Sequence, residues 1–188
     1  MSQNEALRVI CNRRSVRQYK AKQIADGELN QILDAALSAP NAMNQQKWHF
    51  TVIQDKVMLE KMVAIIKENI VNSGNEMLAT RASIPGYHTF HNAPTVILIS
   101  ADDKAKFVQI DCGAAAQNIA LAAESLTIGS CIITSSAFLF SSEKGEEMRK
   151  KLGIPHGYSH VCTVALGYKE GANPVAPPRN ENVINYIK

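Results

Sequence analysis

The segment Arg13-Arg14-Ser15-Val16-Arg17, called here the arginine cluster, places three guanidinium groups and a hydroxyl within five residues. Arginine offers planar pairs of N–H donors that match the oxygens of a phosphate, and a serine hydroxyl adds a further donor at short range. No acidic residue within the segment neutralises these charges. The cluster therefore indicates an anion site, with a phosphomonoester as the specific interpretation. A solvated basic turn is the alternative, because short motifs often match by chance.

Four later segments carry further patterned chemistry. A polar, amide-rich turn runs from Pro40 to Phe50, and Arg179 follows two prolines near the end of the chain. Between them lie the stretch Leu126-Thr127-Ile128-Gly129-Ser130-Cys131, behind an alanine-rich segment, and the stretch Ala165-Leu166-Gly167-Tyr168. Taken in this order with the arginine cluster, these segments resemble the nitroreductase family of FMN-dependent oxidoreductases. The resemblance spans nearly the whole chain.

The resemblance implies a bound FMN and gives the arginine cluster a role. Arg13, Arg14 and Ser15, together with the distant Arg179, would hold the phosphate and the ribityl chain. Arg17 would reach the N1 and O2 side of the flavin ring, where a cation stabilises the negative charge that develops on reduction.

The amide-rich turn has two interpretations. By the resemblance, Pro40, Asn41, Ala42 and Asn44 meet the flavin from the neighbouring subunit of a homodimer, with amides suited to ring carbonyls and nitrogens. Asparagine and glutamine side chains also stabilise turns by bonding to their own backbone, so a purely structural role stays open.

Two departures from the family pattern concern the expected flavin pocket. Ile133 and Thr134 occupy the place where the family presents backbone N–H groups to the flavin, its N5 included, and where glycine is commoner. Their larger side chains predict a narrower space over the ring. Lys47 stands where proline is usual, so the backbone of the turn is expected to differ and Gln46 is assigned no contact.

The resemblance implies that the cofactor carries the reaction and that no protein side chain is catalytic. NAD(P)H would pass hydride to flavin N5, leave, and be replaced in the same pocket by a nitroaromatic, a quinone or a similar small acceptor. The sequence announces no Ser-His-Asp or Cys-His arrangement, and its five scattered histidines give no metal-ligand spacing. Alternatives are a dehalogenase or dehydrogenase on the same scaffold, a non-catalytic flavin-binding or sensing protein, and nucleic-acid binding through the arginine cluster.

Length and composition narrow the classes further. With 188 residues, 46% of them apolar, the chain is expected to fold as one domain over 1–188, and a net charge of +3 is too small to make nucleic acid the expected partner. Four cysteines without Cys-x-x-Cys spacing are typical of reduced, mostly buried thiols in a cytoplasmic protein. Residues 1–5 lack the pattern of a signal sequence, and polar residues such as Asp111 and Glu124 interrupt the most apolar stretch, so neither export nor membrane insertion is expected.

The elements that must position these residues follow from hydrophobic periodicity. Helices are predicted over 5–12, from an N-cap at Asp26 to a stop at Pro40, over 58–70, over 107–126 and over 142–152. Strands are predicted at 50–53, 95–100, 130–133 and 160–166. The fold class is therefore α+β, and the resemblance implies a central, mostly antiparallel sheet flanked by helices. Residues 75–92 are predicted to be irregular, and the resemblance implies that they govern substrate choice. The resemblance also implies that the Gly- and Pro-rich tail beyond Tyr168 forms an arm across the partner subunit.

Overall fold

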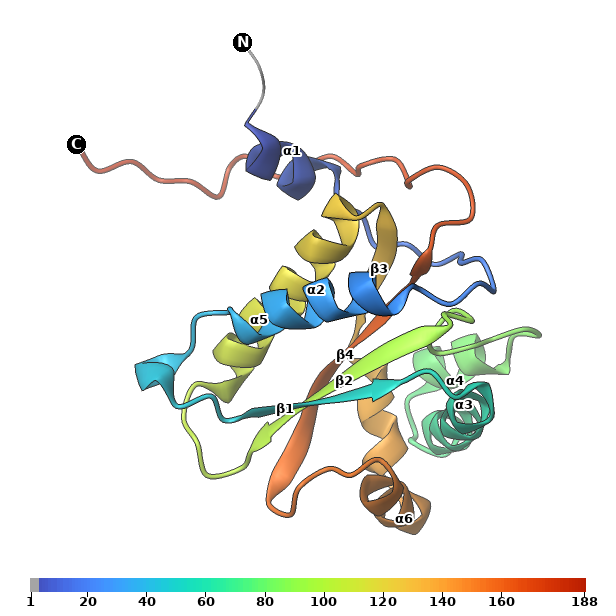
Figure 1. Ribbon diagram of the computed structural model, residues 1–188. Coiled ribbons are helices and arrows are strands. Elements are labelled where there is room, and N and C mark those ends of the chain that lie inside the picture. The colour runs from blue at the N-terminus through green and yellow to red at the C-terminus, as the bar shows by residue number, and fades with distance from the viewer. Residues whose placement is uncertain (1–3) are drawn as a thin grey trace.

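A four-stranded sheet forms the centre of the molecule (Figure 1). The computed structural model describes residues 4–188. The segment 1–5, whose sequence argues against an export signal, therefore lies largely outside the described residues. The strands are β1 (Trp48–Ile53), β2 (Thr95–Asp102), β3 (Ile128–Ile133) and β4 (Tyr158–Tyr168), in the spatial order β1-β2-β4-β3. Every neighbouring pair is antiparallel. Because helices cover both faces of this sheet, the predicted α+β class is confirmed.

The central strand β2 shows why both faces need cover. Val96 and Leu98 pack into the core on one face, Ile97 and Ile99 pack into the core on the other, and all four are fully buried. Successive side chains of a strand point to opposite faces, so a continuous apolar run requires a helical layer on each side.

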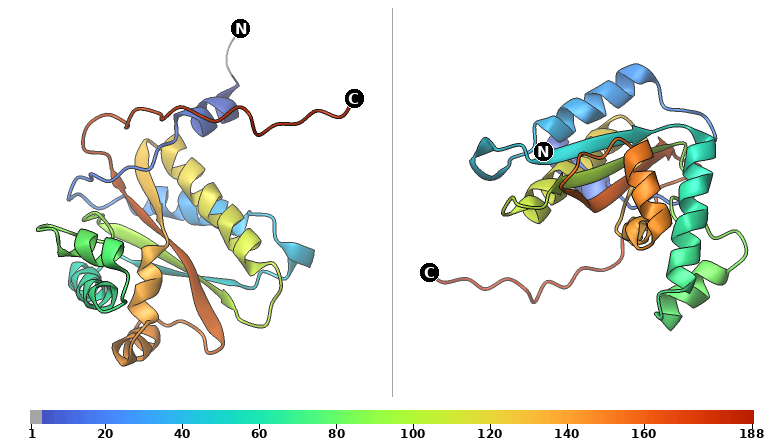
Figure 2. Two further views of the ribbon diagram at one scale, coloured as in Figure 1. Left: turned by 180° about the vertical axis from the view of Figure 1, so that it is seen from behind. Right: turned by 90° about the horizontal axis from the view of Figure 1, so that it is seen from below.

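One face is covered by α2 (Asp26–Leu37) and α5 (Val108–Ser125), as the view from below shows (Figure 2). The polar residues of α5 hold neighbouring segments: the Asn118 side-chain amide donates to the Ala35 carbonyl of α2 at 2.9 Å. The predicted helix over 107–126 agrees with α5 to within one residue at each end. Across residues 4–188, no helix has the length and apolar character that a membrane crossing requires.

The other face is covered by α3 (Lys56–Val71), α4 (Glu76–Ser83), the 3-10 helix η2 (Ser135–Phe140) and α6 (Glu143–Lys151). Met62 and Ile66 of α3 are fully buried against the sheet, together with Leu139 of η2. The second core is thus continuous from α3 to the end of β3.

The prediction of an irregular segment over 75–92 is wrong for its first half, because α4 spans Glu76–Ser83. The Asn75 side-chain oxygen accepts from the Leu78 N–H at 3.1 Å and caps this helix. Residues 84–92 do form a loop.

Two smaller predictions also need correction. Asp26 is the first residue of α2 and not its N-cap, because the N-cap position is held by Ala25. At that end of the helix, the Glu28 carboxylate accepts from the Ala25 N–H at 3.0 Å. The strands β3 and β4 begin earlier than predicted, and β4 also ends later. Of the four cysteines, Cys11 is exposed and the others are buried.

The two ends of the chain meet at the edge of the sheet formed by β3. Helix α1 (Glu5–Asn12) leads into the arginine cluster, and Ser15 forms an isolated parallel bridge with Ser130 of β3. The tail beyond Tyr168 is extended, runs back past α1 and leaves the body of the molecule (Figures 1 and 2). Its contact with a partner subunit stays a prediction.

Candidate functional site

A first cavity, called here the anion cavity, has a volume of about 340 Å³. Arg13, Arg14, Ser15 and Arg17 line it on one side, and residues of the tail, Arg179 among them, line it on the other. The structure therefore brings together the basic residues from both ends of the sequence, which are more than 160 positions apart. That convergence is what the anion-site interpretation requires.

Backbone contacts with β3 fix the arginine cluster. The Val16 N–H donates to the Ser130 carbonyl at 2.9 Å, and the buried Tyr19 hydroxyl donates to the Val16 carbonyl at 2.6 Å. A Cβ atom on Gly129 would lie 2.9 Å from Cγ1 of Val16. Glycine at position 129 is therefore what allows the arginine cluster to lie flat against the strand.

The guanidinium groups keep hydrogen-bonding capacity for a ligand. Arg14 Nη1 donates to the carbonyls of Cys11 and Arg13, each at 2.7 Å, which holds this side chain near the C-terminal end of α1. The Arg13 Nε atom is buried and has no hydrogen-bond partner in the described part of the chain. Within residues 4–188, no carboxylate lies within salt-bridge distance of Arg13, Arg14, Arg17 or Arg179. The charge of the anion cavity is thus uncompensated, as a phosphate site requires.

A polar clasp holds the start of the tail beside this cavity. Lys169 Nζ lies 2.7 Å from Glu124 Oε2, and both side chains are largely buried. The Asn173 side-chain amide donates to Glu124 Oε1 and to the Asn12 carbonyl, each at 3.2 Å. These three residues, Glu124, Lys169 and Asn173, tie the tail to α5 and to the end of α1, so that residues 174–179 pass over the arginine cluster.

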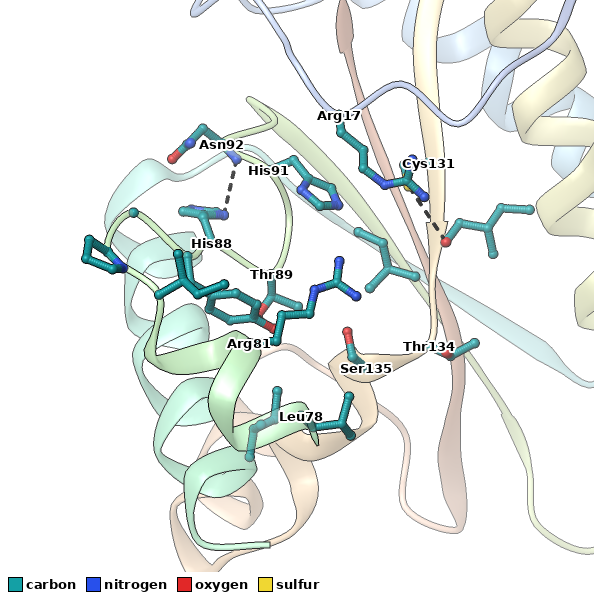
Figure 3. A pocket seen from close by; sticks show the side chains of 17 residues that line it. Arg17, Leu78, Arg81, His88, Thr89, His91, Asn92, Cys131, Thr134 and Ser135 are labelled. Carbon is teal, nitrogen blue, oxygen red and sulfur yellow. Dashed lines mark hydrogen bonds between the residues drawn. The ribbon is translucent and has the colours of Figure 1, made fainter. Parts of the chain in front are cut away.

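The second cavity, called here the larger cavity, has a volume of about 570 Å³ and lies between the end of β3, α4 and the 84–92 loop (Figure 3). Ile133 and Thr134 line it, as does Arg17, which also lines the anion cavity. The two cavities are therefore adjacent and share Arg17 in their linings.

Two histidines of the loop, His88 and His91, line the larger cavity. His88 Nδ1 accepts from the N–H groups of Phe90 and Asn92 at 3.1 and 3.2 Å, and burial lowers the pKa of His88 against the opposing charge of Glu60. Burial, followed by the charges of Arg17 and Arg81, lowers the pKa of His91 to about 4. In the described residues no group of three or more His, Cys, Asp or Glu side chains is arranged to hold a metal ion.

Five residues that line the larger cavity were assigned no role from the sequence: Arg81, Tyr87, His88, His91 and Cys131. The sequence signal for α4 is short: Gly74-Asn75-Glu76 is a helix-start pattern, and Leu78 and Ala82 are four residues apart. That pattern places Leu78 and Ala82 on the core side of the helix. It does not reveal that Arg81 faces a cavity.

The Pro40–Asn44 turn lines neither cavity of its own chain. Figures 1 and 2 show it on the opposite side of the molecule from α4. The Ala42 N–H donates to Asp111 of α5 at 3.1 Å, and the Gln46 N–H donates to the Asn41 side-chain oxygen at 2.8 Å. The Asn41 oxygen therefore serves the turn itself, while Asn44, in the left-handed region with φ of 52°, is exposed.

Comparison with known proteins decides the family. The profile of the nitroreductase family matches residues 10–168. The chain belongs to this family. A protein of Archaeoglobus fulgidus with the provisional name NADH dehydrogenase/NAD(P)H nitroreductase is 36% identical over 170 residues, which cover 87% of this chain and 85% of that protein.

Other members of the nitroreductase family show the range of the fold. The crystal structure of a Bacteroides fragilis nitroreductase with bound FMN superposes with a TM-score of 0.93 at 34% identity, covering 99% of this chain and 100% of that one. An iodotyrosine deiodinase of Thermotoga neapolitana is 24% identical over 181 residues, which cover 93% of each protein. Family membership thus establishes the scaffold and leaves the electron acceptor open.

Proposed function

We propose that this nitroreductase-family protein is an FMN-dependent oxidoreductase that takes electrons from NAD(P)H and passes them to a small acceptor, with residues 1–188 acting as one FMN-binding domain. The observation that carries the proposal is the uncompensated arginine cavity adjacent to the larger cavity. The FMN in the Bacteroides fragilis relative and the NAD(P)H in the name of the Archaeoglobus fulgidus relative support it.

The anion cavity fits the phosphate of FMN. Arg13, Arg14, Ser15 and Arg179 would hold the phosphate and the ribityl chain, and the unpartnered Arg13 Nε atom is a donor that a phosphate group could use. Paired N–H donors on several arginines bind a dianion strongly because each bond is charge-assisted.

The larger cavity fits the flavin ring. Arg17 lines both cavities, so its guanidinium group would lie beside the ring while the phosphate occupies the anion cavity, and it would stabilise negative charge at N1 and O2. Ile133 and Thr134 would contact the ring from the end of β3. Bound FMN supplies the chemistry, a hydride accepted at N5 and electrons passed on to a nitroaromatic, a quinone or a similar acceptor.

We also propose a homodimer with FMN at the interface. Pro40, Asn41, Ala42 and Asn44 lie away from the cavities of their own chain, so they could contact a flavin only in a second copy. Exposed apolar side chains support the same assembly, because a monomer leaves them in water. They are Leu7 and Ile10 of α1, Ile110 of α5, Met43 of the turn, and Val183, Ile184, Tyr186 and Ile187 of the tail.

Replacement of both Arg13 and Arg17 by alanine tests the cofactor assignment. The double variant should purify as a folded protein without the yellow flavin absorbance that the unmodified protein should show, since about two charge-assisted contacts are lost. Arg8→Ala is the matched control, because Arg8 lies on the exposed face of α1 and pairs with Glu5. Stoichiometric flavin in the double variant would contradict the assignment.

Steady oxidation of NAD(P)H in the presence of an added quinone separates an enzyme from a flavin-binding or sensing protein. An enzyme turns over many times, whereas a sensor is reduced once.

A cytoplasmic location stays a prediction.

A further inference from the structure

A polar cluster, called here the His160 cluster, is buried behind the wall of the larger cavity. It consists of Ser136 of η2 and of His160 and Thr163 of β4. Ser136 and Thr163 are fully buried, and His160 is partly buried. None of the three lines either cavity, so the proposed function assigns them no contact with the cofactor. A buried polar network whose hydrogen bonds are made can fix one arrangement of the segments that it joins.

The hydrogen bonds of the His160 cluster place a proton on one nitrogen of the imidazole. The Ser136 hydroxyl donates to the Ile133 carbonyl at 3.2 Å, so its oxygen accepts from His160 Nε2 at 3.1 Å. The Thr163 hydroxyl oxygen lies 3.0 Å from the same nitrogen. His160 Nδ1 is buried and has no hydrogen-bond partner within residues 4–188, so a proton there would be unsatisfied. The neutral ring with its proton on Nε2 fits this cluster.

The surroundings of His160 favour the same neutral ring and attach it to η2 a second time. Burial, followed by the charge of Arg149 of α6, lowers the pKa of His160 to about 4. The Arg149 guanidinium group lies 4.9 Å from the centroid of the Phe140 ring, and the centroids of the Phe140 and His160 rings are 5.8 Å apart. His160 therefore contacts η2 near both of its ends, through Ser136 and through Phe140.

The segment that the His160 cluster holds forms part of the wall of the larger cavity. Ile133, Thr134 and Ser135 line that cavity, and Ser136 follows them directly. Figure 3 shows this stretch leaving the end of β3 and entering η2 beside the cavity. Because the Ser136 hydroxyl bonds both to His160 and to the Ile133 carbonyl, one side chain connects β4 to the backbone of the cavity wall.

We propose that His160 is a positioning residue for flavin reduction, which acts through Ser136 to fix the segment Ile133–Ser135 against the flavin ring. This role rests on the proposed function, which puts the flavin ring in the larger cavity. Hydride transfer depends steeply on geometry, and a misplacement of about 1 Å can cost about 100-fold in rate. His160 lines neither cavity, so its effect passes through the backbone of the segment.

Two substitutions of His160 separate its hydrogen bonds from its packing. His160→Gln places an amide N–H donor near the position of Nε2, whereas His160→Phe keeps a ring against Phe140 and removes the donor. Ser136→Ala removes the other half of the connection. Thr51→Val is the matched control, because the Thr51 hydroxyl donates to the Leu152 carbonyl at 3.3 Å and β1 lies at the opposite edge of the sheet from β3.

Single-turnover reduction of the flavin-loaded protein by NAD(P)H measures the predicted effect. At a saturating donor concentration, the rate of flavin reduction should fall about tenfold in His160→Phe and in Ser136→Ala. The Kd for NAD(P)H should stay within about twofold, because the binding contacts themselves are kept. The visible absorption maximum of bound FMN should move toward that of free FMN in both slow variants. His160→Gln should recover most of the rate and the unmodified spectrum.

A merely structural role of His160 predicts a different pattern. Thermal unfolding of His160→Phe would then occur at a lower temperature, while its reduction rate and flavin spectrum would stay those of the unmodified protein. That result overturns the proposal, as does an equal loss of rate in Thr51→Val. If His160→Phe does not fold, Ser136→Ala decides, since it keeps the imidazole and loses one hydroxyl. An unchanged rate and spectrum in Ser136→Ala also overturn the proposal.

Failure of this inference is distinguishable from failure of the proposed function. An unmodified protein that is colourless, or that does not oxidise NAD(P)H with an added quinone, would contradict the proposed function. A yellow, active protein whose flavin is reduced equally fast in His160→Phe, in Ser136→Ala and without either substitution would contradict the role of His160 alone.

Discussion

The anion cavity and the larger cavity are adjacent, yet different kinds of structure form their walls. Around the anion cavity, the arginine cluster is bridged to β3 and the tail is held by the clasp of Glu124, Lys169 and Asn173. Around the larger cavity, β3 forms one side, and the other side is α4 with the 84–92 loop. The anion cavity is thus built on the edge of the sheet, whereas a separate helix and loop form one side of the larger cavity.

This difference implies that substitutions in α4 can change the larger cavity and leave the anion cavity intact. Helix α4 packs on α3 and lies outside the sheet, so its exposed residues can be replaced without altering the contacts of the arginine cluster. The loop itself is constrained, because His91 and Asn92 both have φ values near +55°, in the left-handed region that favours glycine. The buried Phe90 next to them holds this conformation in place.

The largest effect is expected at the anion cavity, from Gly129→Ala. The added methyl group would lie 2.9 Å from Cγ1 of Val16, which must move away from β3 and take the arginine cluster with it. We expect unfolding to become easier by about 1–3 kcal/mol, as overpacking usually costs, and bound FMN to be lost. Denaturant unfolding and the flavin absorbance of the purified protein measure the two effects.

Gly27→Ala is the matched control for that substitution, because a Cβ atom at position 27 of α2 meets nothing within 4 Å. It should leave the flavin content unchanged. If Gly129→Ala kept both its flavin and its stability, the sheet edge would not be what fixes the arginine cluster.

A smaller effect is expected from the clasp. Asn173→Ala removes the hydrogen bonds to Glu124 and to the Asn12 carbonyl, so the tail and Arg179 are held less firmly over the anion cavity. The Kd for FMN should rise about tenfold, which corresponds to the roughly 1.4 kcal/mol of one or two hydrogen bonds. Fluorescence quenching of added FMN measures it.

Asn182→Ala provides the same chemical change farther along the tail, where the Asn182 backbone N–H donates to the Asn180 side-chain oxygen and the Asn182 side chain makes no hydrogen bond within residues 4–188. Its Kd for FMN should match that of the unmodified protein. Equal losses in both variants would mean that the clasp has no special role.

The smallest effect is expected in the 84–92 loop, when the pH is lowered. When the 84–92 loop opens, the pKa of His91 returns from about 4 toward its ordinary 6.5, so the open loop binds a proton that the closed loop does not. The closed loop is therefore fully stable above pH 6.5 and loses stability as the pH falls toward 4. At pH 5 the loss should be about 1 kcal/mol, allowing for the half-exposed ring.

Amide hydrogen exchange in residues 84–92, corrected for the intrinsic effect of pH, measures this loss. His91→Gln should reduce the pH dependence and leave the part due to His88 of the same loop, whose pKa burial also lowers, while His156→Gln, at an exposed site away from the loop, should retain it in full. An undiminished pH dependence in His91→Gln would contradict the assignment. The corrected hydrogen exchange of the β3 amides next to the arginine cluster should not depend on pH.

Much of the fold was predictable because it depends on local pattern. The apolar run at 95–100 predicts a buried strand, and the spacing of apolar residues in 107–126 predicts α5 to within one residue. Helix α4 was missed because it is short and flanked by Gly74, Pro85 and Gly86, which are typical of a loop. Packing against α3, together with the Asn75 cap, stabilises this helix of eight residues.

The candidate site divides in the same way. By itself the sequence predicted the kind of chemistry, because three arginines and a serine within five residues favour an anion as ligand. Only the tertiary structure decided that Arg179 joins them, that Pro40–Asn44 does not, and that Arg81 faces the larger cavity. The physical reason is that charge and donor geometry belong to the side chain, whereas distance between residues far apart in the sequence depends on how the sheet and helices pack.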